Sequence, residues 1–166
     1  MAAPLLLAGC VAFEDETAGL CPSAAILEEP GQLVRFKTKQ SSAPNEILFQ
    51  TKMLQLSGVC DFDEKVIDME LQIAMHAQRG PANKEGKAQF VYFVAILDRD
   101  KKVLNRVEFP MIAIFERQDT EINFTEAVTV TIPRNKTLSP SDYLVYVGFE
   151  MTAKELAFNR RRLRRR

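Results

Sequence analysis

The sequence predicts a mainly β fold, a two-layer antiparallel sandwich of about seven strands with a short C-terminal helix, and three features carry this prediction. Apolar and polar residues alternate along most segments between residues 20 and 151, as expected for strands with one buried face. Residues 90–97 are apolar at every position, which suits a central strand covered on both sides. Turn-forming residues separate these segments at short intervals, so the strands are expected to pair as antiparallel neighbours.

The alternation is clearest in three segments. In residues 65–77 the odd positions are the apolar ones: Ile67, Met69, Leu71, Ile73, Met75 and Ala77. In residues 121–132 the inward set is Ile122, Phe124, Val128, Val130 and Ile132. In residues 143–151 it is Tyr143, Val145, Val147, Phe149 and Met151. Residues 33–37 and 53–62 supply two earlier strands, and Cys60 has the same parity as Leu54, Leu56 and Phe62, so we expect all four to face the core.

The remaining strand, residues 103–116, is expected to be interrupted at Pro110. Proline cannot donate a hydrogen bond to a neighbouring strand, so we expect a bulge, a change of sheet or a sheet edge at this position. Polar loops at residues 79–86, 98–102 and 133–140 connect the strands. The number and spacing of the strands resemble the immunoglobulin and fibronectin sandwiches, a likeness of architecture that carries no function.

The C-terminal segment predicts a helix. Thr152 and Glu155 have the spacing of a capping box, so we expect a helix from Ala153 to about residue 162, with Leu156 and Leu163 on one face. The predicted organisation is therefore an N-terminal segment of residues 1–19, a sandwich domain of residues 20–151, and a helix with an arginine-rich tail in residues 152–166. We expect residues 1–19 and 159–166 to be poorly ordered, because neither segment can bury an apolar face.

Charge is distributed unevenly along the chain. The sequence holds 22 basic and 22 acidic residues, and six of the basic ones are arginines near the C-terminus, which leaves 16 basic against 22 acidic residues in the body. Such a tail predicts binding to an anionic partner: an anionic phospholipid, an acidic glycan or a partner protein. The alternative is a solvated tail without a partner. The candidate anion-binding residues are Arg160, Arg161, Arg162, Arg164, Arg165 and Arg166.

Residues 5–10 read Leu-Leu-Leu-Ala-Gly-Cys. This order resembles the lipobox of bacterial lipoproteins, and the resemblance implies cleavage before Cys10 and a diacylglyceryl thioether on its sulfur. A small lipoprotein of a Gram-negative, proteobacterial envelope would then face the periplasm, and Val11 in place of an aspartate favours the outer membrane. Residues 1–9 contain no Lys or Arg, so we expect the basic region of the signal peptide upstream of Met1. The alternative is a cytosolic protein in which Cys10 is a free thiol.

The sequence contains three cysteines. If Cys10 carries a lipid, Cys21 and Cys60 remain, and in an oxidising periplasm we expect them to form a disulfide. The alternative is a pair of reduced, buried thiols. Neither cysteine has a nearby Cys or His partner, so a metal site is not expected there.

No arrangement of residues predicts catalysis. His76 is the only histidine, no glycine-framed nucleophile accompanies it, and Asp98 with Asp100 lacks the remainder of a calcium loop, so these aspartates are expected to form turns. We therefore expect no enzymatic activity, no cofactor and no metal. The sequence predicts a non-enzymatic, membrane-anchored periplasmic lipoprotein that acts as a binding or assembly module. The alternative function is a cytosolic nucleic-acid-associated β-domain protein that uses its arginine tail.

Overall fold

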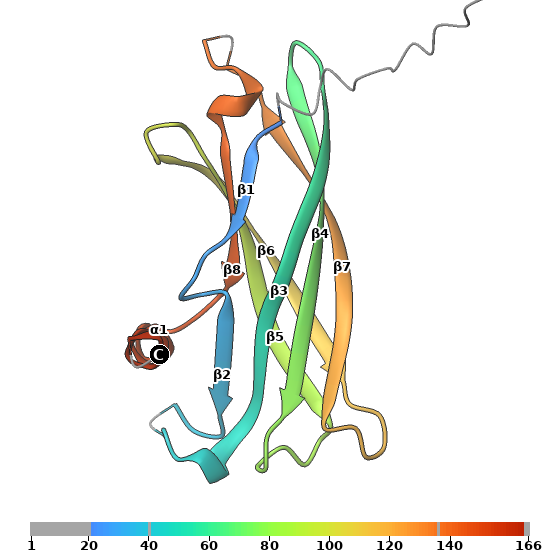
Figure 1. The fold of residues 1–166 in the computed structure, drawn as a ribbon, viewed down its shortest axis with the longest axis vertical. Coiled ribbons are helices and arrows are strands. Elements are labelled where there is room, and N and C mark those ends of the chain that lie inside the picture. The colour runs from blue at the N-terminus through green and yellow to red at the C-terminus, as the bar shows by residue number, and fades with distance from the viewer. Residues whose placement is uncertain (1–20, 40, 136, 165–166) are drawn as a thin grey trace, which may run out of the picture.

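The computed structural model describes residues 21–39, 41–135 and 137–164, and it shows a mainly β fold with one α-helix (Figure 1). Two short 3-10 turns, Pro44–Glu46 and Pro140–Asp142, lie between strands, and the helix α1 spans Ala153–Leu163. The described part contains eight strands: β1 (Ser23–Ile26), β2 (Gln32–Phe36), β3 (Ile47–Phe62), β4 (Val66–Arg79), β5 (Lys87–Leu97), β6 (Val103–Ile114), β7 (Glu121–Pro133) and β8 (Leu144–Phe149).

The strands form two four-stranded sheets that face each other. The strand orders are β1-β8-β5-β6 and β2-β3-β4-β7, and every pairing is antiparallel except that of β1 with β8. The predicted two-layer, largely antiparallel sandwich is therefore confirmed. The prediction of about seven strands missed β1, which has only four residues and no repeated alternation by which it could be recognised.

The core lies between the two sheets, where the predicted inward faces of β4, β7 and β8 meet β5. The residues predicted to face inward on β4 are all at most 3% exposed, so that prediction is confirmed. β5 is central in its sheet, as predicted from its apolar faces. Its Tyr92 stacks on Phe109 with ring centroids 5.0 Å apart, and burial raises the pKa of Tyr92 to about 12.

A register shift in β3 changes which residues face the core. Phe49, Thr51 and Met53 are buried, but the pairing with β4 shifts between Met53 and Gln55. After this β-bulge the even-numbered residues face inward, and Cys60 is half-buried against the core. The expectation that Leu54 faces inward is wrong: it lies within the bulge, and 52% of it is exposed.

Pro110 lies in a continuous strand at the edge of its sheet. β6 pairs only with β5, so the predicted edge position is confirmed, whereas the predicted interruption is wrong. The Val91 carbonyl accepts a hydrogen bond from the Glu150 amide, on the side of β5 away from β6. The opposed pair Val91–Pro110 is therefore not hydrogen-bonded, and the Pro110 nitrogen points to the open edge, where no ladder bond is lost.

A basic surface at the C-terminal helix

The helix α1 begins at the predicted capping box. The Glu155 amide donates to Thr152 Oγ1 at 3.3 Å, and the Thr152 amide donates to Glu155 Oε2 at 2.8 Å. Three arginines, Arg160, Arg161 and Arg162, occupy the last turn, where positive charge is favourable next to the exposed carbonyl groups. The predicted helix is confirmed and ends at Leu163.

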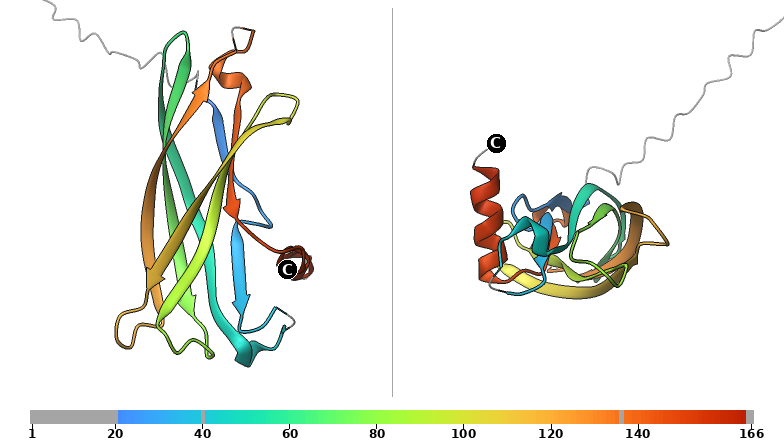
Figure 2. Two further views of the ribbon diagram at one scale, coloured as in Figure 1. Left: turned by 180° about the vertical axis from the view of Figure 1, so that it is seen from behind. Right: turned by 90° about the horizontal axis from the view of Figure 1, so that it is seen from below.

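One polar side chain anchors α1 to the sandwich. Asn159 is 1% exposed, and its amide nitrogen donates to the backbone carbonyls of Glu29 at 2.8 Å and Gln32 at 2.5 Å. The Glu29 carbonyl lies in the turn between β1 and β2 and the Gln32 carbonyl at the start of β2, so the helix is held beside β2 and across the long axis of the sandwich (Figure 2). Phe158 adds an edge-to-face contact with Phe36 of β2, with ring centroids 5.4 Å apart.

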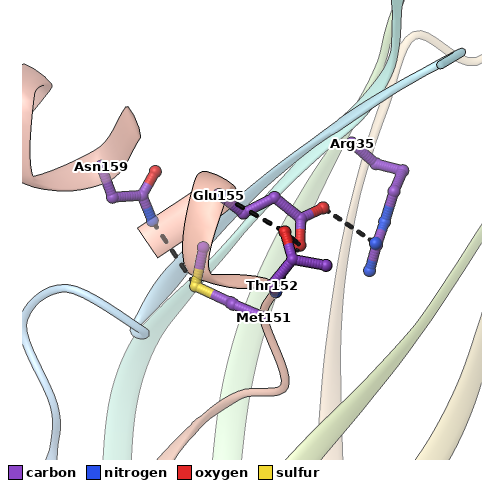
Figure 3. A network of polar contacts seen from close by, with 5 residues as sticks. All are labelled: Arg35, Met151, Thr152, Glu155 and Asn159. Carbon is purple, nitrogen blue, oxygen red and sulfur yellow. Dashed lines mark hydrogen bonds and ion pairs between the residues drawn. The ribbon is translucent and has the colours of Figure 1, made fainter. Parts of the chain in front are cut away.

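Two ion pairs link the helix to the same part of the sandwich. Arg35 Nη1 lies 2.8 Å from Glu155 Oε1, and Arg160 Nε lies 3.0 Å from Glu29 Oε1. The first pair is partly shielded, because the Glu155 side chain is only 13% exposed (Figure 3). Glu155 therefore closes the helix N-terminus and binds β2 through different carboxylate oxygens.

The expectation that residues 159–166 are poorly ordered is wrong for the part that the structure describes. Asn159 is buried and the helix continues to Leu163, with Arg164 as its C-terminal cap. The expectation considered only apolar contacts, whereas the helix is held by an amide and two ion pairs. Arg165, Arg166 and the N-terminal residues 1–19, including Cys10, lie outside the described residues.

The arginines of the candidate site do not behave alike. Arg160 is engaged with Glu29, and Arg162 lies over the Phe158 ring at 5.8 Å. Arg161 and Arg164 are exposed. Within the described ranges, none of Arg161, Arg162 and Arg164 forms an ion pair. These three guanidinium groups therefore lie at the end of a helix whose position is fixed, with Arg161 and Arg164 exposed and Arg162 half-buried.

A small cleft opens between α1 and the end of β2. It has a volume of about 110 Å³, and its polar lining includes Arg35, Lys39, Lys154 and Arg161 together with the hydroxyls of Thr38, Ser41 and Ser42. Phe36 and Phe158 form its apolar wall. Glu155 is the one carboxylate in this lining, and it is already paired with Arg35.

Two wider cavities are also lined by Arg35. One, of about 450 Å³, is lined by Arg35, Lys37, Lys84 and Lys87 with Glu85. The other, of about 510 Å³, combines apolar residues of β5 and β6 with Arg35, Glu150 and Glu155. Positive charge therefore continues from α1 around the end of β2 on the side of the 450 Å³ cavity. The sequence did not indicate this gathering, because the lysines come from separate strands and loops.

The other candidate residues have structural roles. Cys21 and Cys60 form a disulfide with an S–S distance of 2.02 Å, as predicted. His76 shares a 3.0 Å hydrogen bond with Asn123 on the outer face of β4 and β7. Asp98 Oδ1 accepts the amides of Asp100 and Lys102, so its predicted role in a turn is confirmed.

Asp63 closes the β3–β4 hairpin in a similar way. Its carboxylate accepts the Lys65 and Val66 amides at 2.6 and 2.9 Å, and these bonds hold the pKa of Asp63 below its usual value. In the portion that the structure describes, no three His, Cys, Asp or Glu side chains come together as metal ligands. No helix there has the length and apolar character needed to cross a membrane.

Basic side chains thus gather around α1 and the end of β2, where α1 is held in a fixed position against the sandwich. Comparisons with known protein families, with curated proteins and with solved structures found no match to this chain.

Proposed function

We propose that this protein is a non-enzymatic binding module of the bacterial envelope, anchored by a lipid on Cys10, whose helix α1 binds an anionic membrane surface. The docking of α1 through Asn159 carries the proposal, because it turns an arginine-rich tail into a surface of fixed shape. Anionic lipids attract each basic group near their surface with about 1 kcal/mol. Arg161, Arg162 and Arg164 supply such groups.

The cysteines support the envelope location. Disulfides persist in oxidising compartments, and the Cys21–Cys60 bond accords with a periplasmic face. Cys10 and Cys21 are eleven positions apart in the sequence. A fully extended chain of that length reaches at most about 40 Å. A tether of this length keeps the domain close to the membrane, so even a weak affinity of α1 suffices for contact. Val11 after Cys10 favours the outer membrane.

Lipidation of Cys10 has a direct test. When the gene is expressed in a Gram-negative host from its longest in-frame start, radiolabelled palmitate should enter the protein, and globomycin should block its processing. Cys10→Ala should abolish the label, whereas the Cys21→Ala variant should keep it. Label that persists in Cys10→Ala contradicts the lipid anchor and favours the cytosolic alternative, in which α1 binds nucleic acid.

If α1 binds the membrane, neutralising its three arginines that form no ion pair among the described residues should cause a large loss of affinity for anionic vesicles. We expect Arg161→Gln, Arg162→Gln and Arg164→Gln together to weaken binding to phosphatidylglycerol vesicles at low salt, at about 1 kcal/mol per charge, by on the order of a hundredfold. The full chain with Cys10→Ser, assayed by vesicle co-sedimentation, provides the measurement. Substitutions are preferable to truncation at residue 160, which would also remove the last turn of α1.

The matched control removes the same charge elsewhere. Arg99, Lys101 and Lys102 lie exposed in the β5–β6 turn, and their triple glutamine variant should bind the vesicles as the parent does. Equal weakening in both triple variants would mean that vesicles respond to net charge alone, and the proposal would fail. Binding that is unchanged in the α1 variant would also contradict it.

We further propose that the sandwich is of the immunoglobulin or fibronectin type. The strand pairing supports this type, because β4 pairs with β7 in one sheet while β5 pairs with β8 in the other. In addition, the buried Tyr143 at the start of β8 accepts the Asn135 amide at 2.8 Å, a bond of the kind made by the tyrosine corner of such domains. The parallel pairing of β1 with β8 is a departure from the simplest form.

A further inference from the structure

We propose that the cleft between α1 and the end of β2 is a specific site for a phosphate ester, carried either by a phospholipid headgroup or by a soluble sugar phosphate. This inference deepens the proposed function and rests on it for the lipid source. The cleft is the cavity lined by Arg35, Lys39, Lys154, Arg161, Phe158 and their neighbours between the helix and strand.

The charge of the cleft favours a multiply charged anion. Arg35 and Glu155 neutralise each other across 2.8 Å. The second oxygen of Glu155 accepts from both the Thr152 amide and hydroxyl, at 2.8 and 2.9 Å. Both carboxylate oxygens are thus engaged within the protein, and the positive charges of Lys39 and Arg161 remain to attract a ligand.

The hydroxyl groups suit the oxygens of a phosphate. Thr38, Ser41 and Ser42 line the cleft beside the cations, and each hydroxyl can donate one hydrogen bond. Ser41 Oγ already accepts the Ala43 amide at 3.1 Å, which leaves its own proton for a ligand. Hydrogen bonds to an ionised oxygen are shorter and stronger than those to a neutral one. A phosphate can use several such donors at once.

The apolar wall indicates an ester rather than a bare ion. Phe36 and Phe158 meet edge to face and both line the cleft, so part of the cleft surface is carbon. A glycerol or sugar carbon bonded to the phosphate would cover this surface and remove it from water. The volume of about 110 Å³ admits a small organic phosphate, and the rest of a larger ester would extend into solvent.

The neighbouring cavities fit this ligand less well. The 510 Å³ cavity has two carboxylates, Glu150 and Glu155, against the single guanidinium of Arg35. The 450 Å³ cavity is basic but wide, and Glu85 lies among its lysines. Only the cleft, among the cavities described, combines several cations, free hydroxyl donors and an aromatic wall in a small space.

The test uses the full chain with Cys10→Ser, titrated with glycerol 3-phosphate and glucose 1-phosphate at constant ionic strength and followed by nitrogen-15 NMR. We expect saturable shifts of amides around Lys39, Ser42 and Arg161 with at least one ester. The double variant Lys39→Gln/Ser42→Ala should weaken this binding at least tenfold. Lys102→Gln/Ser57→Ala, a matched change on exposed residues elsewhere, should have no effect.

Competition identifies the source of the phosphate. Displacement of the protein from phosphatidylglycerol vesicles by glycerol 3-phosphate, but not by equal sulfate, supports a lipid headgroup. Saturable binding of glucose 1-phosphate without displacement supports a sugar phosphate. Shifts that sulfate reproduces, or that Lys39→Gln/Ser42→Ala leaves unchanged, overturn the cleft as a phosphate site even if vesicle binding persists. Absence of vesicle binding in the parent would refute the membrane function. The titrations with glycerol 3-phosphate and glucose 1-phosphate would still decide whether the cleft binds a phosphate ester.

Discussion

Replacing both Cys21 and Cys60 by serine should lower the free energy of unfolding by about 4 kcal/mol. The estimate follows from the loop that the disulfide closes, 39 residues in sequence separation, because the bond reduces the entropy of the unfolded chain. For a chain of this size the melting temperature should fall by on the order of 10 °C. Chemical denaturation of the Cys10→Ser chain, with and without the double substitution, measures the difference.

The fold explains why this bond matters beyond the unfolded state. Cys21 lies two residues before β1, a four-residue strand at the edge of its sheet, and Cys60 lies near the end of β3 in the other sheet. The bond thus ties the first strand to both layers. Reduction of the parent should reproduce the loss. Two alkylatable thiols in natively isolated protein, or equal stability of the serine variant, would contradict the prediction.

Asn159→Ala should detach α1 from the sandwich and lower its stability by about 2–4 kcal/mol. The substitution leaves the partly buried Glu29 and Gln32 carbonyls without their donor, and a carbonyl shielded from water that loses its partner costs about 1–3 kcal/mol. Alanine is a better helix former than asparagine, so helix propensity opposes this loss and cannot explain it. Hydrogen exchange of the α1 amides should rise well above that of β4.

The matched control is Arg164→Ala at the exposed end of the same helix, which should leave exchange and stability nearly unchanged. The function should respond as well: because Asn159→Ala retains every arginine, weaker vesicle binding would show that the fixed position of α1 contributes to affinity. Slow exchange of α1 in Asn159→Ala would mean that the ion pairs and Phe158 hold the helix without the amide.

The parts of the fold that could be predicted are those specified by local pattern. The alternation in β4 and β7 identifies their buried faces, because a strand with one wet face needs that period. The start of α1 follows from the Thr152–Glu155 spacing, since a capping box involves only four neighbouring residues. The disulfide was predicted from the number of cysteines and from the expected oxidising compartment. That prediction did not require knowledge of the topology.

The parts that were missed depend on distant residues. The bulge after Met53 is set by pairing with β4, and it reverses the exposure of Leu54 without any mark in the local sequence. Asn159 reads as one polar residue of a basic helix until the β1–β2 turn brings two carbonyls to it. The basic cleft likewise joins Lys39 to Arg161, which lie far apart in the chain.

Pro110 has a consequence for the solubility of the protein. An exposed edge strand can recruit a strand from another molecule and so begin aggregation, particularly where apolar side chains accompany it. β6 is such an edge, and Ile112 and Ile114 on it are 56% and 59% exposed. The missing N–H of Pro110 interrupts the row of outward donors in the middle of this strand. The same residue that costs the sandwich no hydrogen bond therefore denies a continuous template to neighbouring copies of the chain.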